Sequence, residues 1–100
     1  MAFYTIHPRD VKQIFYQKRA VMLDIREPED YEEYHFPVAE NYPYEDSECW
    51  INALNRRRTY ILYCEHGSTS LIAARKLSRH GFEAYTVIGG VEALRTYFYN

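Results

Sequence analysis

Cys64 is the residue in this sequence whose surroundings are best suited to chemistry. It ends the short apolar run at residues 60–63 and precedes a polar loop that contains Gly67, after which a helical pattern begins. In such a loop the backbone N–H groups converge, and the helix N-terminus adds positive potential. Both effects stabilise a thiolate, which is the nucleophilic form of cysteine. The sequence therefore indicates a candidate nucleophile, with a small buried side chain at a strand end as the alternative.

Strand and helix patterns alternate on either side of this unit. Apolar runs predict strands, a proline-flanked segment predicts a brief edge strand, and helical spacing predicts the helices between them. The expected strands cover residues 3–6, 20–26, part of 35–43, 60–64 and 83–88, and the expected helices cover residues 8–19, 29–34, 44–54, 71–79 and 91–98. This alternation predicts an α/β fold with a parallel sheet and helices on both faces. In such folds a site lies at the carboxyl ends of the strands.

The helix after the cysteine loop has a defined apolar pattern and a clear end. Leu71, Ile72, Ala74 and Leu77 recur at roughly helical spacing, and we expect these four side chains to face the core. The pair His80-Gly81 is typical of a helix C-terminus, so we expect the helix to end there.

A polar pair stands at the end of another expected strand. Asp24 and Arg26 lie at the carboxyl end of the segment 20–26, on the same edge of the sheet as Cys64. Asp24 could accept hydrogen bonds from backbone amides, and Arg26 could pair with a carboxylate. We interpret them as a structural pair that closes the strand beside the candidate site.

Length and composition limit the possible classes of protein. The 100 residues predict one domain, residues 1–100, and the net charge of −2 gives no basis for binding nucleic acid or an anionic membrane. No apolar run approaches the roughly 20 residues that span a bilayer, and the N-terminus lacks the pattern of a signal peptide.

Two cysteines make no disulfide framework, so we expect a cytoplasmic protein with reduced thiols, in which Cys49 lies in the core or is partly exposed. The cysteines and histidines show no metal-ligand spacing, and we expect no metal and no cofactor.

Three segments of the chain resemble the rhodanese-like domain family. They are the apolar-Asp-apolar-Arg-Glu segment at residues 21–31, the loop that follows residues 61–64 with Gly67 and Ser70, and the Gly-Gly segment at residues 87–94. The resemblance extends over nearly the whole chain and rests on the three segments together. It implies a small, mostly parallel five-stranded α/β domain with helices on both faces.

The same resemblance implies a sulfurtransferase. Cys64 matches the cysteine that accepts sulfane sulfur as a persulfide and passes it to a thiol or another acceptor. The loop amides would surround the outer sulfur, which implies substrate-binding roles for Glu65, His66, Gly67, Ser68, Thr69 and Ser70. Asp24 and Arg26 match a structural pair of the family. The implied partners are a small sulfur donor and a thiol or protein acceptor.

The loop departs from the family pattern in its charge. Family members often carry arginine at the positions of Glu65 and Thr69, where this chain has an acidic and a neutral residue. A carboxylate beside the thiol opposes its ionisation and repels an anionic donor such as thiosulfate, although protonated His66 partly compensates. We therefore expect the loop charge to limit the use of thiosulfate. Val38 stands where the family has a glycine, so we also expect the turn at residues 34–39 to differ.

Two other functions are compatible with this fold. One is a non-catalytic rhodanese-like binding or regulatory module, which the charge of the loop favours and the presence of Cys64 disfavours. The other is a phosphatase, because some cell-cycle phosphatases share the fold. Such enzymes have a longer loop, closed by an arginine that grips the phosphate with two hydrogen bonds. Here the closing positions are Thr69 and Ser70, and the next arginine, Arg75, falls within the expected helix.

Overall fold

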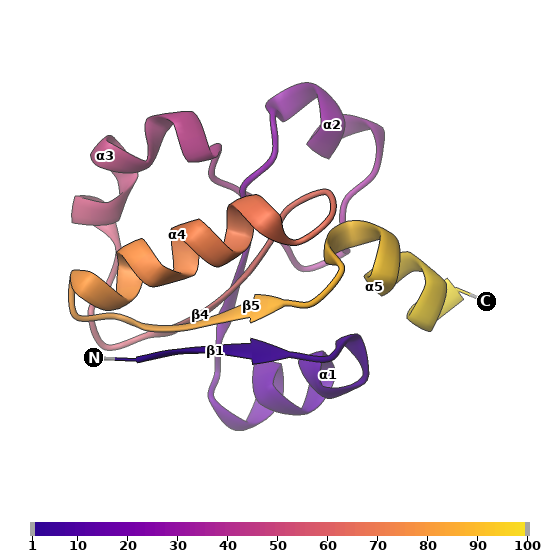
Figure 1. Cartoon of the computed structure of the whole chain (residues 1–100), viewed down its shortest axis with the longest axis horizontal. Helices are drawn as coiled ribbons and strands as arrows, with labels where there is room; N and C mark the ends of the chain where they lie inside the picture. Colours follow the sequence, from indigo (N-terminus) through magenta and orange to yellow (C-terminus); the bar gives the residue numbers. More distant parts are fainter. Residues whose placement is uncertain (1, 100) are drawn as a thin grey trace.

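Five parallel strands form one sheet in the computed structural model, which describes residues 2–99 (Figure 1). The strand order across the sheet is β1-β5-β4-β2-β3, and each neighbouring pair is parallel. The strands are β1 (Phe3–Ile6), β2 (Val21–Asp24), β3 (Glu40–Asn41), β4 (Thr59–Tyr63) and β5 (Glu83–Val87). This arrangement confirms the α/β fold expected from the sequence, and it places the proline-flanked strand β3 at an edge.

Helices cover both faces of the sheet. They are α1 (Pro8–Gln17), α2 (Pro28–Glu33), α3 (Ser47–Trp50), α4 (Ser68–Arg79) and α5 (Gly90–Tyr99), with 3₁₀ turns η1 (Tyr44–Asp46) and η2 (Ile51–Ala53) on either side of α3. Val11 of α1 and Leu94 of α5 pack on one face of the sheet, whereas Trp50 of α3 and Leu77 of α4 pack on the other. None of the helices within residues 2–99 is long and apolar enough to cross a membrane.

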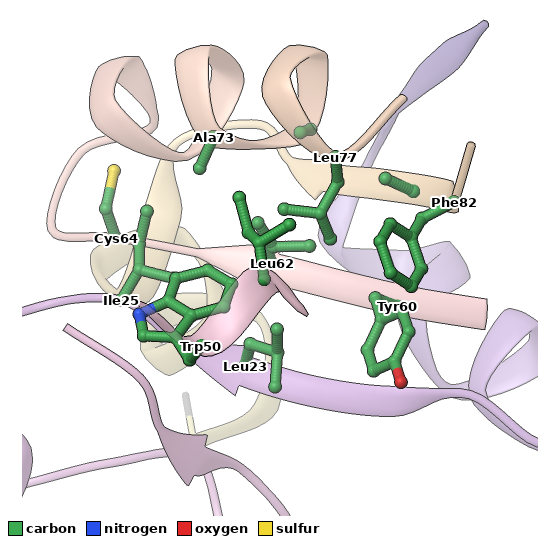
Figure 2. Packing of buried hydrophobic residues seen from close by; sticks show 12 residues of the cluster. Leu23, Ile25, Trp50, Tyr60, Leu62, Cys64, Ala73, Leu77 and Phe82 are labelled. Atoms are coloured by element: carbon green, nitrogen blue, oxygen red, sulfur yellow. The ribbon is translucent and has the colours of Figure 1, made fainter. Parts of the chain in front are cut away.

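Strand β4 is the centre of both cores. All five of its residues are buried, as expected for a central strand of a parallel sheet. Ile61 and Tyr63 belong to the cluster under α1 and α5, and Leu62 points into the cluster under α4. Figure 2 shows Cys64 at one end of this second cluster, beside Ile25, with its sulfur directed towards the loop that enters α4. The sheet therefore fixes Cys64 at the end of its most buried strand.

The prediction of one helix over residues 44–54 is wrong, because this segment is divided into η1, the four-residue α3 and η2. Asp46 has φ of −97° and ψ of 13°, which interrupts the helix before Ser47. The indole N–H of Trp50 donates to the carbonyl of Pro43 at 2.8 Å, and this contact ties the short turns to the core. Asp, Ser and Asn in the segment compete with helical hydrogen bonds, which favours short turns over one long helix. Cys49 is exposed, contrary to the expectation that it lies in the core or is partly exposed.

The buried face of α4 is also displaced from the expected one. Leu71 and Ile72 are 42% and 55% exposed, whereas the buried stripe runs through Ser70, Ala73, Ala74, Leu77 and Ser78. These five positions have the i, i+3, i+4, i+7, i+8 spacing of a single helix face. Small residues on that face let α4 lie close to the sheet, and close approach outweighs the burial of two larger side chains. The expected helix end at His80-Gly81 is confirmed, since His80 is the C-cap of α4.

Candidate active site

The sulfur of Cys64 lies at the carboxyl end of β4, at the point where the chain turns towards α4. The backbone N–H groups of Gly67 and Ser70 donate to Sγ at 3.1 and 3.3 Å, and the thiol donates to the Ser70 hydroxyl at 3.5 Å. Cys64 is only 5% exposed, so these contacts act in a largely desolvated setting. Two amide donors and a helix N-terminus favour negative charge on the sulfur, which makes Cys64 a suitable nucleophile.

Gly67 and Ser70 hold the loop in this shape. Gly67 is the N-cap of α4 and has φ of 111°, a backbone conformation that residues with a side chain rarely adopt. In this conformation its N–H points towards the sulfur. Ser70 is fully buried, and its hydroxyl contacts the hydroxyl of Thr86 at 2.7 Å and donates to the Gly67 carbonyl at 3.3 Å. The loop is thereby anchored to the neighbouring strand β5 through Thr86.

The Gly89-Gly90 turn packs against the other side of the cysteine loop. The N–H of Val91 donates to the carbonyl of Cys64 at 2.8 Å. A Cβ atom on Gly90 would lie 2.5 Å from the carbonyl oxygens of both Cys64 and Glu65. This close contact between two backbones explains why glycine is needed at position 90, next to the candidate site.

Asp24 and Arg26 form a buried ion pair beside the loop. Arg26 donates from Nε and Nη2 to the Asp24 carboxylate at 2.7 to 3.2 Å, and its backbone N–H donates to Asp24 Oδ1 at 3.0 Å. Burial opposes the charge of Arg26, but the hydrogen bonds and charge of Asp24 outweigh it and raise the pKa of the guanidinium above its usual value. The guanidinium also donates to the Tyr34 carbonyl at 2.5 Å, so the pair ties β2 to the end of α2.

Arg26 reaches the cysteine loop through Glu65. Its Nη1 lies 3.2 Å from Oε1 of Glu65, whose side chain is 49% exposed. The carboxylate next to Cys64 is therefore held by a cation and is not directed freely at the thiol. This partner reduces the effect that we expected Glu65 to have on the sulfur.

A cavity of about 290 Å³ opens beside the thiol. Besides Cys64 it is lined by Ile25, Arg26, Glu27, Asp30, Tyr44, Glu45, Glu65 and Thr69. The carboxylates come from the start of α2, from η1 and from the cysteine loop, which are three separate parts of the sequence. A small substrate or one residue of a partner could reach Cys64 through this opening.

Comparison with known proteins decides the family. The sequence model of the Rhodanese-like domain matches residues 7–96. This chain belongs to the rhodanese-like domain family. It is 32% identical over 80 residues to a tRNA sulfurtransferase of Pyrobaculum aerophilum, a match that covers 80% of this chain and 16% of that protein. The chain thus spans less than a fifth of that relative.

Relatives of similar length also carry sulfurtransferase names. The thiosulfate sulfurtransferase GlpE of Pseudomonas syringae pv. syringae is 30% identical over 90 residues, which cover 89% of this chain and 85% of that protein. A solved rhodanese-related protein from Thermoplasma volcanium superposes with a TM-score of 0.87 at 25% identity, over 97% of this chain and 95% of that one. These similarities confirm the resemblance that the three sequence segments indicated.

The other loop residues of this rhodanese-like domain take different positions. Thr69 lines the cavity with Cys64, whereas Ser68, the first residue of α4, lines a neighbouring depression together with His66. The imidazole of His66 lies 2.9 Å from the carboxylate of Glu92, on the surface. The structure therefore brings the amides of Gly67 and Ser70 to the sulfur, and it places the His66 ring in contact with α5.

Sequence reasoning missed the carboxylates on the far side of the cavity. Glu27, Asp30 and Glu45 line it together with Glu65, and none of the first three was selected from the sequence as a site residue. One signal was available, because the acidic segment 27–30 directly follows the strand that carries Asp24. Glu45 gave no such signal, because its approach depends on the broken helical segment before α3.

Within residues 2–99, no group of three or more His, Cys, Asp or Glu side chains is placed so that it could hold a metal ion.

We expect this rhodanese-like domain to hydrolyse phenyl phosphates no faster than background. Residues 65–70 contain no arginine, and Arg26 is already bound to Asp24 and Glu65. The charge that builds up on phosphoryl oxygens would therefore meet no free cationic clamp. Release of p-nitrophenol from p-nitrophenyl phosphate measures this, with Cys64→Ser as the blank. Turnover above that blank would restore the phosphatase interpretation.

Proposed function

We propose that this domain is a sulfurtransferase in which Cys64 accepts sulfane sulfur as a persulfide and passes it to a thiol or another acceptor. The observation that carries the proposal is the pair of amide donors, from Gly67 and Ser70, directed at Cys64 Sγ. The same donors suit the terminal sulfur of a persulfide, which is also anionic. Membership of the rhodanese-like domain family and the sulfurtransferase names of its relatives agree with this role.

The chemistry is a pair of displacements at sulfur. In the first, the Cys64 thiolate attacks the sulfane sulfur of a donor; with thiosulfate, the S–S bond to sulfite breaks and sulfite leaves with the bonding electrons. In the second, an acceptor thiolate attacks the outer sulfur of the Cys64 persulfide, and the cysteine leaves as a thiolate. The sulfane sulfur keeps its oxidation state in both steps, so no external oxidant or reductant is required.

The loop amides and the helix N-terminus contribute to both displacements. Cys64 attacks as a thiolate in the first step and leaves as a thiolate in the second, and the amides of Gly67 and Ser70 would stabilise that charge in each step. The hydroxyl of Ser70, held by Thr86, keeps the loop in place while the sulfur is transferred. The site therefore supplies a preformed anion cradle instead of a separate general base.

The proposed partners are a small sulfur donor and a thiol or protein acceptor. The net charge of −2 and the carboxylates around the cavity disfavour direct binding of a polyanion such as nucleic acid. The relatives named tRNA sulfurtransferases extend far beyond the matched segment, which covers 16% and 14% of two of them. We therefore propose no tRNA substrate for this chain.

Intact-mass measurement tests the proposed function. After incubation with a polysulfide donor, the wild-type protein is expected to gain the mass of one sulfur atom, and dithiothreitol should remove it. Cys64→Ser is expected to gain none. The matched control is Cys49→Ser, which removes an exposed thiol outside the loop and should leave the gain unchanged. Absence of the gain in the wild type, or its persistence in Cys64→Ser, would favour the non-catalytic module instead.

A further inference from the structure

The cavity beside Cys64 has an unusual balance of charge. Four carboxylates line it, from Glu27, Asp30, Glu45 and Glu65. Among the described residues, Arg26 is the one cationic side chain in the lining. Glu27, Asp30 and Glu45 are exposed, so they face the solvent through which a substrate must arrive. The field at the entrance is therefore negative.

Arg26 does not offset this field, because its positive charge is already paired with carboxylates and its hydrogen-bond donors are occupied. The guanidinium contacts the buried carboxylate of Asp24, the carbonyl of Tyr34 and the carboxylate of Glu65. The single charge of Arg26 is shared between Asp24 and Glu65, so it does not balance the other three carboxylates of the lining, Glu27, Asp30 and Glu45. An incoming anion therefore finds no free cation in the cavity lining that the structure describes.

Two of the carboxylates repel each other in the absence of a cation. A hydrogen bond with Glu45, aided by partial desolvation and by the charges of Glu45, Glu29 and Asp30, raises the pKa of Glu27 to about 6. The raised pKa means that negative charge on Glu27 is disfavoured by its acidic neighbours, and a positive group nearby would offset that repulsion. The geometry thus favours a cation at the mouth of the cavity, next to the thiol.

We propose that the Cys64 cavity selects acceptors in which a thiol stands next to a fixed positive charge. This inference rests on the proposed sulfurtransferase function and names its acceptor class. The positive group would bind beside Glu27 and Glu45, which line the cavity, while the thiol points inwards to the sulfur of Cys64. Both a small aminothiol and a cysteine flanked by lysine or arginine in a polypeptide have this chemistry.

The transfer itself needs only these two groups. The acceptor thiolate forms a bond to the outer sulfur of the Cys64 persulfide, and the S–S bond of that persulfide breaks. Its electron pair returns to Cys64, which becomes a thiolate held by the amides of Gly67 and Ser70. The acceptor leaves as a persulfide, and the numbers of atoms and electrons are unchanged. A positive charge on the acceptor offsets the carboxylates as its anionic thiolate approaches.

The test uses protein loaded with one sulfur on Cys64 and a set of acceptors that differ in charge. The small acceptors are cysteamine, which carries an ammonium group, 2-mercaptoethanol, which is neutral, and 3-mercaptopropionate, which is anionic. Two short peptides form a second arm, one with cysteine between lysines and one with cysteine between glutamates. Loss of the added sulfur mass against time gives a second-order rate constant for each acceptor.

The variant Glu27→Gln/Glu45→Gln removes two carboxylates from the cavity. We expect the ratio of the rate constants for cysteamine and 2-mercaptoethanol to fall about tenfold. Each removed charge is expected to lower this ratio about threefold at this separation in solvent, and the two effects multiply. Using a ratio within each protein cancels the different acidities of the two thiols. The matched control is Glu33→Gln/Glu40→Gln, which removes the same charge from exposed positions outside the cavity lining and should leave the ratio within about twofold of wild type.

The outcomes separate this inference from the proposed function. If Cys64 takes up no sulfur, the proposed function fails. If sulfur is taken up and passed on, but the ratio is the same in wild type and in the cavity variant, only the charge selection is overturned. A fall in the control variant equal to that in the cavity variant would overturn it as well. Support comes from the expected fall, and a faster reaction of the lysine-flanked peptide than of cysteamine then identifies a polypeptide as the source.

Discussion

Replacing Arg26 with methionine is expected to lower the free energy of unfolding by about 3–5 kcal/mol, because it leaves a buried carboxylate without its counter-charge. Asp24 is fully buried, and Arg26, itself 9% exposed, donates three side-chain hydrogen bonds to it. Methionine retains most of the aliphatic packing, so the loss reports mainly on the charge. Urea unfolding at pH 7, followed by far-ultraviolet circular dichroism, gives the difference between the two proteins.

Two further variants isolate the buried charge as the cause. Arg75→Met removes an exposed arginine of α4 and is expected to change stability by less than about 0.5 kcal/mol. Asp24→Asn/Arg26→Met removes both charges, and we expect it to recover a large part of what the single Arg26 variant loses. A single Arg26 variant as stable as Arg75→Met would show that the ion pair contributes little to the fold.

The fold could be predicted because its signals are local and repeated along the chain. Alternation of apolar strand runs with helical patterns gives a parallel sheet with helices on both faces, whereas the central place of β4 is known only from the strand order of the structure. The His-Gly signal placed the end of α4 correctly, and the expected start of the last helix at residue 91 lies one residue after the observed start of α5. The prediction failed at residues 44–54, where polar residues and the hydrogen bond of Trp50 to Pro43 break a helix that the apolar spacing favours.

The site was predictable in part, for a similar reason. Cys64 and its loop are contiguous in the sequence, so the strand-loop-helix pattern alone brings the amides of Gly67 and Ser70 near the sulfur. The contact between Arg26 and Glu65 joins residues that are 39 positions apart, and the approach of Glu45 depends on the turns around α3. Such contacts depend on tertiary packing, which spacing in one sequence does not encode.

Gly90 is a second place where tertiary packing constrains the cysteine loop. The Gly89-Gly90 sequence predicts a tight turn, and the structure adds that the turn lies directly against the carbonyls of Cys64 and Glu65. Two separate costs would follow from a side chain at position 90. One is the positive φ of 65°, which residues with a Cβ rarely adopt, and the other is the approach to 2.5 Å of two backbone oxygens. Neither oxygen can move without moving the loop that holds the sulfur.

Gly90→Ala is therefore expected to lower the free energy of unfolding by about 2–5 kcal/mol, the sum of backbone strain and overpacking. The folded fraction is also expected to accept sulfur more slowly, because the carbonyl of Cys64 must shift away from the new methyl group. Urea unfolding and the rate of sulfur uptake by intact mass measure the two effects.

Gly81→Ala is the matched control: its φ of 90° is also positive, but the nearest atom to a new Cβ is the end of the flexible Arg56 side chain, at 3.1 Å. That variant should lose only about 1–2 kcal/mol and take up sulfur at the wild-type rate. Equal losses in both variants would mean that the close contact at Gly90 does not constrain the loop, and that only the backbone conformation matters there.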